Sequence, residues 1–415
     1  MNKIAHVILK QNEEVEVQQG FPYVYDNEID CIKYKNDAGK NLTQSLKEAD
    51  IQNGSVVEVF ARAGAFLGTG IINKASKITI RFIGFEHADK IMQDTKLYWS
   101  KIINNAINIR NLNFSVNESC RLVFAESDFV PGLIVERYVS KGKVYLLVQF
   151  LALACEVFRD EILSALISCC KPTAIYERSE GALRIKEGLE ERCSWIFSKG
   201  EDVFPIVEND IILEIDIAHG QKTGYFLDQK RNREYIRKFC KGKRVLDAFC
   251  NLGAFGLNAK KAGAKEVISV DISEDAIKSV ERNISLNNMT NISVVCEDVF
   301  DLLKKYEAAK QKFDVIILDP PAFTKSAKQI QKAYGGYKEI NLRAMRLIHK
   351  GGILITCSCS YYFDSNTFYS MIMHAARDSH RRVQILEKRG ASPDHPVLLG
   401  YPQSEYLKCA ICRVI

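Results

Sequence analysis

The stretch Val245-Leu246-Asp247-Ala248-Phe249-Cys250-Asn251-Leu252-Gly253-Ala254-Phe255-Gly256 decides the fold, because an apolar run enters a turn that contains glycine. A second apolar run, Val267-Ile268-Ser269-Val270-Asp271, follows it. Two parallel strands joined by a helix produce this pattern, and an acid at the end of the second strand can hold both hydroxyls of a ribose. The pattern therefore predicts a site for a nucleoside-containing cofactor.

The same stretch discriminates between cofactors. It lacks the Gly-x-Gly-x-x-Gly pattern that seats a pyrophosphate on helix amides, and a phosphate there would meet the carboxylate of Asp247. A cationic ligand without phosphates fits better. S-adenosylmethionine, with its sulfonium and amino acid head, is such a ligand, and we predict it as the cofactor. A nicotinamide dehydrogenase is disfavoured because the glycine fingerprint is missing.

The composition is that of an ordinary globular chain. Its 415 residues are 47% hydrophobic and 26% charged, which is enough for two or three cores. No apolar run is long enough to span a membrane, and the N-terminus lacks a signal-peptide core. We therefore expect a cytoplasmic protein that does not contact a membrane and whose 13 cysteines stay reduced.

The net charge of +6 is unevenly distributed. Residues 1–75 hold 8 Lys and Arg against 10 Asp and Glu, whereas residues 201–415 hold 32 against 26. The positive excess, which would suit a polyanion, lies mainly with the expected cofactor domain.

The sequence pattern divides the chain into three domains. Residues 1–75 alternate β-rich runs with turn signals, which predicts a small barrel-like β domain. Residues 76–195, beginning with a strand at Ile78–Ile83, predict an α+β middle domain that is a candidate for RNA contact. Residues 196–415 predict an α/β domain with a doubly wound parallel sheet. Its expected strands are Arg244–Ala248, Glu266–Asp271, Ile292–Cys296, Asp314–Asp319 and Ile353–Cys357.

Acids stand where the expected strands of this sheet end, and ligands of such sheets bind beyond those ends. Asp247 is placed to receive the ammonium group of the cofactor, or else to cap the next helix. Asp271 is the candidate for the ribose, with a helix cap as the alternative. Asp298 could accept a hydrogen bond from the adenine amino group, or be an acidic turn residue.

The run Asp319-Pro320-Pro321-Ala322-Phe323 ends an apolar strand, and its prolines hold the chain extended. Backbone carbonyls and the Asp319 carboxylate are then available to accept hydrogen bonds from a base. Phe323 can stack on the ring of that base, as unpaired bases are commonly held. The alternative is a simple strand terminator.

The run Thr356-Cys357-Ser358-Cys359-Ser360 ends the fifth expected strand. A thiolate can add to C6 of a pyrimidine and make C5 reactive enough to attack a sulfonium methyl group. Both cysteines could instead be small buried hydrophobic residues. We favour that alternative for Cys357 and chemistry for Cys359.

A basic segment, Thr324 to Lys338, contains interleaved tyrosines. Lysines can meet phosphates and tyrosines can stack on bases, although a solvated helix face is the ordinary alternative. The substrate-binding candidates from this region are Pro320, Pro321, Phe323, Lys325, Tyr337 and Lys338. Upstream, Gly220 to Gln229 places polar and aromatic side chains just before the first expected strand.

These segments closely resemble the bacterial ribosomal RNA large-subunit methyltransferase I family over nearly the whole chain. The most specific matches are Lys222-Thr223-Gly224-Tyr225-Phe226-Leu227-Asp228-Gln229, Asp319-Pro320-Pro321-Ala322-Phe323, Gly336-Tyr337-Lys338-Glu339-Ile340-Asn341, Ser358-Cys359-Ser360, Asp394-His395-Pro396-Val397 and Tyr406-Leu407-Lys408. The resemblance implies a PUA-like domain, a small α+β domain and a Rossmann-like catalytic domain.

The implied reaction is S-adenosylmethionine-dependent methylation of a cytosine C5 in 23S ribosomal RNA. Cys359 matches the catalytic cysteine of the family, and Asp319 lies in its base-holding motif. The expected catalytic residues are therefore Cys359 and Asp319. The expected cofactor-binding residues are Tyr225, Phe226, Asp228, Gln229, Asp247, Phe249, Gly253, Asp271, Asp298 and Asp319.

Two other functions stay open. Related enzymes with the same Asp-Pro-Pro-x-Phe pattern methylate guanine N7, a ring nitrogen that needs no thiolate. A non-catalytic RNA-binding protein is the other alternative. As partners we expect ribosomal RNA of the large subunit and no metal ion, and we leave a homodimer open.

Overall fold

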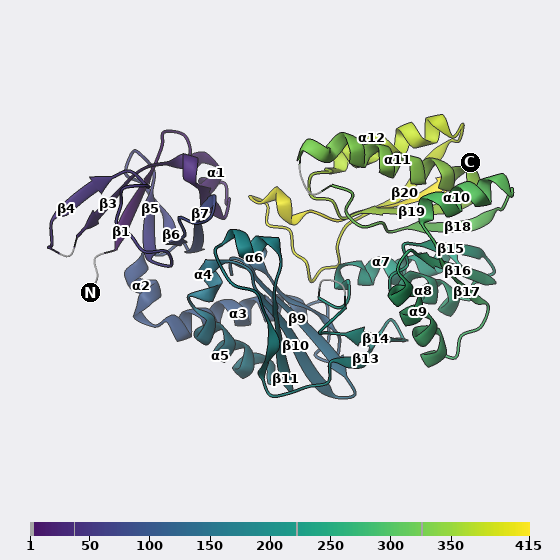
Figure 1. Cartoon of the computed structure of the whole chain (residues 1–415), viewed down its shortest axis with the longest axis horizontal. Helices are drawn as coiled ribbons and strands as arrows, with labels where there is room; N and C mark the ends of the chain where they lie inside the picture. Colours follow the sequence, from purple (N-terminus) through teal and green to yellow (C-terminus); the bar gives the residue numbers. More distant parts are fainter. Residues whose placement is uncertain (1–3, 37, 221–222, 325–326) are drawn as a thin grey trace. The chain divides into compact units, whose positions relative to one another are not determined.

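The computed structural model describes residues 4–36, 38–220, 223–324 and 327–415, and the chain forms two compact units (Figure 1). The first unit comprises Met1–Val203, Asp216–Tyr225 and Pro393–Ser404. The second unit comprises Phe204–Ile215, Phe226–Ser392 and Glu405–Ile415. Each unit is described below by itself.

The N-terminal part of the first unit is a β-sheet with the strand order β2-β7-β6-β5-β1-β3-β4. Alternating apolar residues such as Val7, Val57 and Val59 point into one buried core, which is why these runs form strands. The elements are β1 (Ala5–Leu9), α1 (Glu14–Gln18), β2 (Tyr23–Tyr25), β3 (Ile29–Lys35), β4 (Asn41–Gln44), β5 (Val56–Phe60), β6 (Phe66–Ile72) and β7 (Ile78–Gly84).

Strand β7 belongs to this sheet, although its sequence was expected to open the middle domain. It pairs antiparallel with β6 and with β2. The backbone N–H of Asn73 donates to the carbonyl of Thr79 at 2.7 Å and closes a hairpin, and Ile80 lies in the sheet's core. The polar residues around 75 are therefore a turn, and a boundary at residue 75 would separate β7 from its partners.

The rest of the first unit is an α+β structure, with the sheet order β12-β11-β10-β9-β8. Helices α3 and α5 pack together, and residues such as Trp99, Ile103 and Leu146 form the core between helix and sheet. The elements are α2 (Ala88–Gln93), α3 (Thr95–Asn111), β8 (Cys120–Phe124), β9 (Leu133–Ser140), β10 (Lys143–Phe150), α4 (Leu153–Glu156), α5 (Arg159–Cys170), β11 (Ala174–Ser179), α6 (Ala182–Lys186) and β12 (Arg192–Phe197).

The second unit contains a doubly wound sheet with the order β17-β16-β15-β18-β19-β21-β20, as expected for its parallel part. Helices α10, α11 and α12 lie on one side of the sheet and α8 and α9 on the other (Figure 1). The elements are β13 (Val203–Glu208), β14 (Ile211–Asp216), α7 (Lys230–Tyr235), β15 (Arg244–Ala248), α8 (Ala254–Lys261), β16 (Glu266–Asp271), α9 (Glu274–Leu286), β17 (Ile292–Cys296), α10 (Val299–Ala308), β18 (Phe313–Leu318), α11 (Ile330–Leu347), β19 (Ile348–Ser358), α12 (Ser365–Asp378), β20 (Val383–Arg389) and β21 (Lys408–Val414).

The strand order reverses between β15 and β18, which makes this point the topological switch of the sheet. The parallel strands read as apolar runs because they are buried on both faces, as Val245 and Leu246 illustrate. Strand β21 runs antiparallel to β19 and to β20 and completes the sheet. The carboxyl ends of β15, β16, β18 and β19 therefore meet at one edge, here called the carboxyl edge.

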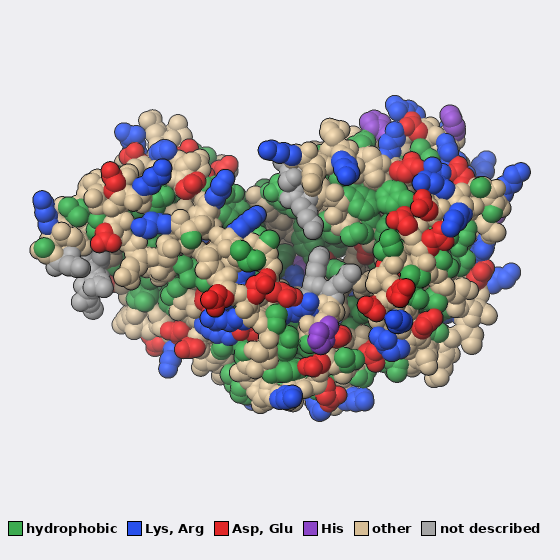
Figure 2. Space-filling model, viewed as in Figure 1, with side chains coloured by type: hydrophobic (Ala, Val, Ile, Leu, Met, Phe, Trp, Pro, Cys, Tyr) green, Lys and Arg blue, Asp and Glu red, His purple; other side chains and the backbone are tan. Residues whose placement is uncertain are grey.

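Charges of both signs are interspersed over the face shown in Figure 2, in keeping with the modest net charge. In the part of the chain that the structure describes, no helix has the length and apolar character needed to cross a membrane.

Candidate cofactor and catalytic site

The turn after β15 is built from left-handed residues. Phe249, Asn251 and Gly253 have φ of 64°, 48° and 75°, values that residues other than glycine seldom adopt. A Cβ at Gly253 would lie 2.9 Å from Val280 Cγ1, so only glycine fits there. The turn brings the N–H of Asn251 to Asp271, to which it donates at 3.0 Å. This tight loop leads the chain directly into α8.

Asp247 is buried with one oxygen bonded and the other free. Its Oδ2 accepts from the N–H of Gly256 at 2.8 Å, which satisfies one donor of the first turn of α8. Its Oδ1 is buried and has no hydrogen-bond partner among the described residues. Burial, followed by the charges of Asp319 and Asp271, raises the pKa of this carboxyl to about 7. A buried acceptor left unsatisfied costs about 1–3 kcal/mol, so the geometry fits a cationic donor such as an ammonium group.

Asp271 lies at the end of β16 and holds two turns. Its Oδ2 accepts from Asn251 N and its Oδ1 from Ser273 N, each at 3.0 Å. The cap of α9 is Ser273, whose hydroxyl accepts from Ala276 N at 3.3 Å. Each carboxylate oxygen has a second lone pair, so Asp271 can also accept from ribose hydroxyls.

Asp298 caps helix α10. Its Oδ1 accepts from the N–H of Phe300 at 2.7 Å and from that of Asp301 at 3.4 Å. The sequence-based alternative for this residue was an acidic turn, and the structure shows a helix cap instead. Contact with an adenine amino group stays a prediction that the second carboxylate oxygen would have to fulfil.

Gln229 positions Asp319. The side-chain amide of Gln229, which is 2% exposed, donates to Asp319 Oδ1 at 2.9 Å. Its carbonyl oxygen accepts from Asn232 Nδ2 at 2.7 Å, and Asn232 Oδ1 in turn accepts from Arg389 Nε at 2.8 Å. Sequence reasoning missed Asn232 and Arg389, because neither stands in a motif and their contact spans more than 150 residues.

Other predicted cofactor residues lie around the same segment. Asp228 is buried, and its Oδ2 accepts from the hydroxyl of Tyr406 at 2.5 Å. Its Oδ1 has no hydrogen-bond partner within the described residues. The carbonyl of Phe226 accepts from Arg233 at 2.8 Å, and Tyr225, in the first unit, is buried.

The proline run after β18 presents one side chain to an aromatic cluster. Pro320 is buried and Pro321 is exposed. The ring of Phe323 lies 4.5 Å from that of Tyr337 and 5.8 Å from that of Phe300. The ring of Phe323 therefore packs against the rings of Tyr337 and Phe300.

The structure corrects the expectation for Tyr337. Tyr337 is fully buried, its hydroxyl shares a hydrogen bond of 2.8 Å with Ser360 Oγ, and it cannot offer its ring to a base. Its position on α11 puts it in the core instead. Lys338 forms a partly exposed ion pair with Asp378 at 2.5 Å, and its contact with a phosphate stays a prediction. Lys325 lies outside the described residues.

The two cysteines at the end of β19 differ in burial. Cys357 is fully buried opposite Cys409 of β21, and contact with that thiol together with burial raises its pKa well above the ordinary value. It is a structural residue. Cys359 follows the last residue of β19 and is partly exposed.

Lys408 lies near Cys359, although the sequence motifs assigned it no role. It is 3% exposed, and its Nζ donates to the carbonyls of Ser360 at 2.8 Å and of Tyr406 at 2.7 Å. Burial lowers its pKa to about 8. No local pattern signals a buried lysine, because its environment comes from residues on another strand.

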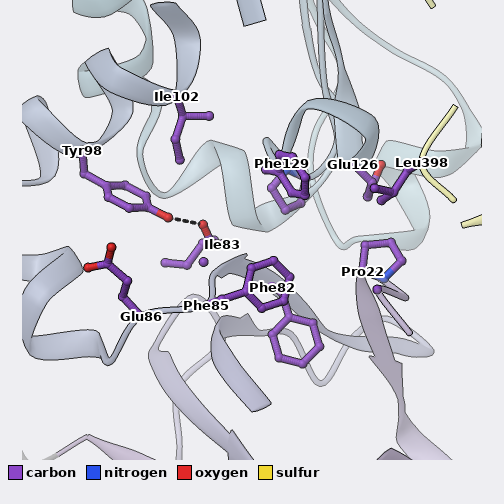
Figure 3. A pocket seen from close by; sticks show the side chains of 13 residues that line it. Pro22, Phe82, Ile83, Phe85, Glu86, Tyr98, Ile102, Glu126, Phe129 and Leu398 are labelled. Atoms are coloured by element: carbon purple, nitrogen blue, oxygen red, sulfur yellow. Dashed lines mark hydrogen bonds between the residues drawn. The ribbon is translucent and has the colours of Figure 1, made fainter. Parts of the chain in front are cut away.

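A second region of interest is a cavity of about 330 Å³ in the first unit (Figure 3). Its lining is mostly apolar and includes Phe82, Phe85, Glu86, Tyr98, Phe129 and Leu398. Phe85 and Phe129 are 54% and 51% exposed, and their ring centroids lie 6.5 Å apart. The hydroxyl of Tyr98 donates to the carbonyl of Ile83 at 2.5 Å. Sequence reasoning did not anticipate this cavity.

The loop that carries Phe129 is held by a buried ion pair. Arg110 Nη1 and Nη2 donate to the two oxygens of Asp128 at 2.5 and 2.6 Å, and Asp128 also accepts from Phe124 N at 2.6 Å. Phe129 itself has a φ of 60°. A bulky residue in that conformation is strained, so the surrounding bonds must impose it.

Across the described ranges, no group of three or more His, Cys, Asp or Glu is arranged to hold a metal ion.

Two family models match the sequence. The model described as S-adenosylmethionine-dependent methyltransferase matches residues 173–399, and the model described as PUA-like domain matches residues 7–85. The first covers more than half of the chain.

Curated relatives match along the full length. A protein of Photobacterium profundum named ribosomal RNA large subunit methyltransferase I is 36% identical over 413 residues, which cover 98% of this chain and 99% of the relative. A protein of the same name from Tolumonas auensis is 36% identical, with 99% of each chain covered.

Solved structures agree with the fold. A chain from Streptococcus mutans, described as a SAM-dependent methyltransferase, superposes with a TM-score of 0.79 at 20% identity and covers 99% of this chain and 100% of its own. A methyltransferase complexed with SAH gives the same TM-score and identity, with both chains fully covered. At this identity the likeness speaks for the fold alone.

Proposed function

The chain belongs to the ribosomal RNA large subunit methyltransferase I family and is an S-adenosylmethionine-dependent methyltransferase, and from this premise we propose that it methylates C5 of a cytosine in 23S ribosomal RNA. The observation that carries the choice of atom is the thiol of Cys359. Cys359 is partly exposed and directly follows β19, and Asp319 directly follows the neighbouring strand β18. Cytosine C5 is unreactive without such a nucleophile, whereas a ring nitrogen needs none.

The carboxyl edge supplies groups that fit each part of the cofactor. We assign the amino acid head to Asp247, whose buried Oδ1 has no hydrogen-bond partner among the described residues, and the ribose to Asp271. Asp298 is assigned to the adenine amino group. The turn through Phe249 and Gly253 lets the ligand approach the backbone closely. The remaining assigned residues are Tyr225, Phe226, Asp228, Gln229 and Asp319.

When bound, S-adenosylmethionine supplies the electrophilic methyl group. Cys359, as the thiolate, adds to C6 of the cytosine, and the electron pair of the C5–C6 double bond moves to C5, which becomes nucleophilic. After methylation, a water molecule held near Asp319 takes the proton from C5. The electrons of that C–H bond restore the double bond and expel the Cys359 thiolate.

The residues around Asp319 hold the base. Gln229 fixes one oxygen of Asp319, and we assign the contact with the cytosine amino group to this carboxylate. Pro320 and Pro321 keep the following carbonyls extended, and Phe323, braced by Tyr337, is placed to stack on the base. Tyr337 thus acts behind Phe323 rather than on the substrate.

The test is to incubate the purified protein with S-adenosylmethionine and unmodified ribosomal RNA, digest the RNA to nucleosides and identify the product by mass spectrometry. We expect 5-methylcytidine from the unaltered protein and none from Cys359→Ala. Cys193→Ala, which removes an exposed thiol of β12, is the matched control and should keep full activity.

A product of 7-methylguanosine that persists in Cys359→Ala would overturn the covalent mechanism and leave Cys359 a structural role. An absence of any methylated nucleoside, with cofactor binding intact, would favour the non-catalytic RNA-binding alternative.

A further inference from the structure

We propose that Lys408 is a positioning residue that favours the thiolate form of Cys359 and fixes the backbone next to it. The inference rests on the proposed function, because a thiolate is needed only if Cys359 attacks the base. It assigns a role to a residue that the mechanism above does not use.

The geometry places the ammonium of Lys408 against the turn that carries the thiol. Lys408 is the first residue of β21 and pairs with Ser358, the last residue of β19. Its Nζ donates to the carbonyl of Ser360, the residue after Cys359, and to the carbonyl of Tyr406. The lysine therefore links the segment after β19, at the residue next to Cys359, to the segment before β21.

The environment of Lys408 is costly for a cation, which argues for a function. Burial of an ammonium is strongly unfavourable unless it is paired, and a methionine of similar length would pack there without this cost. Two neutral carbonyls satisfy two of its three N–H donors. Within the described part of the chain Lys408 forms no ion pair with a carboxylate, so its charge is not cancelled at contact distance.

The titratable neighbours of Lys408 include Cys359. Burial is the largest influence on the pKa of Lys408 and lowers it to about 8, while the charges of Cys359, Asp364 and Glu405 raise it, that of Cys359 the most. Asp364 comes from the cap of α12 and Glu405 from the segment before β21. On α11, Tyr337 also interacts electrostatically with Cys359. Lys408 is still mostly protonated at neutral pH, so it presents a positive charge to the thiol.

A nearby cation lowers the pKa of a cysteine. The thiol of Cys359 then loses its proton to water more readily, and the electron pair left on sulfur is the one that forms the bond to C6. Each unit by which the pKa of the thiol falls gives about a tenfold higher thiolate fraction at a pH below that pKa.

The first experiment titrates Cys359 without any substrate. Lys408→Met removes the charge and keeps the length, and Lys408→Arg keeps the charge. Alkylation by iodoacetamide is followed from pH 6 to 10, and the peptide that contains Cys359 is quantified by mass spectrometry, with the Cys193 peptide as an internal control. We expect the midpoint for Cys359 to rise by about one pH unit in Lys408→Met and to stay near the original value in Lys408→Arg.

Equal midpoints in the three proteins would overturn the inference while leaving the proposed function intact. If Lys408→Met does not fold, Lys408→Gln provides a second neutral variant with the same readout.

In the methylation assay we expect about a tenfold lower kcat at pH 7 for the neutral variant, an unchanged KM for S-adenosylmethionine and a smaller difference at pH 9. A loss of kcat that is equal at both pH values would also contradict the role, whereas activity that survives Cys359→Ala would instead overturn the proposed function.

Discussion

The carboxyl edge of the second unit and the aromatic cavity of the first unit both contain turns with left-handed residues. They differ in whether their buried acidic side chains are paired. At the carboxyl edge, Asp247 keeps a buried oxygen that has no partner in the part of the chain that the structure describes. Beside the cavity, Asp128 and Glu126 are paired with Arg110 and Arg81, at 2.5 and 2.6 Å. One region holds polar groups ready for a ligand, and the other has a mostly apolar lining whose acid Glu126 is paired with Arg81.

The difference shows how the same local strain can support two purposes. At the carboxyl edge the left-handed turn through Asn251 aims a backbone N–H at Asp271, so the strain orders polar groups. In the first unit the strain at Phe129 turns a large ring outward, where it is half exposed. In the first case the strained conformation lowers stability but positions polar groups of a binding site. In the second case it lowers stability but exposes an apolar ring.

The largest expected effect tests the acid pairing of the first unit. Arg110→Met leaves Asp128 buried without its partner, which should destabilise the protein by about 3–5 kcal/mol. Chemical denaturation followed by circular dichroism measures it. Lys143→Met, which breaks an exposed ion pair with Glu201, is the control and should leave stability almost unchanged. A small effect at Arg110 would mean that the pair does not hold the loop.

The second-largest expected effect concerns Asp247 at the carboxyl edge and the affinity for S-adenosylmethionine. Asp247→Asn removes the negative charge and should weaken S-adenosylmethionine binding by about 2–5 kcal/mol, because the ammonium of the ligand loses its partner. Isothermal titration calorimetry measures the affinity. Asp301→Asn, on the exposed side of α10, serves as the control. Unchanged affinity in Asp247→Asn would remove this residue from the cofactor site.

A pH effect follows from the raised pKa of Asp247, about 7. The cationic head binds the carboxylate form, which is depleted as the pH falls below 7. Affinity for S-adenosylmethionine should therefore rise about tenfold from pH 6 to pH 8 and level off above that, after the ordinary titration of the ligand is accounted for. Asp247→Asn should lack this dependence. An affinity that falls as the pH rises would contradict the assignment.

The smallest effect tests the strain at the cavity. Phe129→Gly relieves a left-handed conformation that costs a bulky residue about 1–2 kcal/mol. Part of this gain in stability is lost because glycine is more flexible in the unfolded chain. We expect a net gain in stability of up to about 1 kcal/mol in thermal and chemical unfolding. Phe85→Ala removes a similarly exposed ring without positive φ and should give no such gain. A loss of stability in Phe129→Gly would show that the ring packs more than its exposure suggests.

The sequence by itself determined the strands of the second unit and the residues at their ends. The runs Arg244–Ala248 and Glu266–Asp271 are mostly apolar and bounded by turns, so their strands follow from local pattern alone, and these predicted bounds agree with the structure. The positions of Asp247, Asp271 and Cys359 at the carboxyl edge then follow from the geometry of parallel strands. The family and the cofactor were also within reach of the sequence, because short motifs carry them.

Only the tertiary structure decided which of these groups are free and which are engaged. Tyr337 stands in a basic segment but is buried by α11, β7 lies in the first sheet through its hairpin, and Lys408 reaches Ser360 across two antiparallel strands. The bond from Gln229 to Asp319 likewise joins residues that are 90 positions apart. Local pattern records the period of an element and its ends, whereas burial and pairing depend on contacts between distant segments that exist only once the chain has folded.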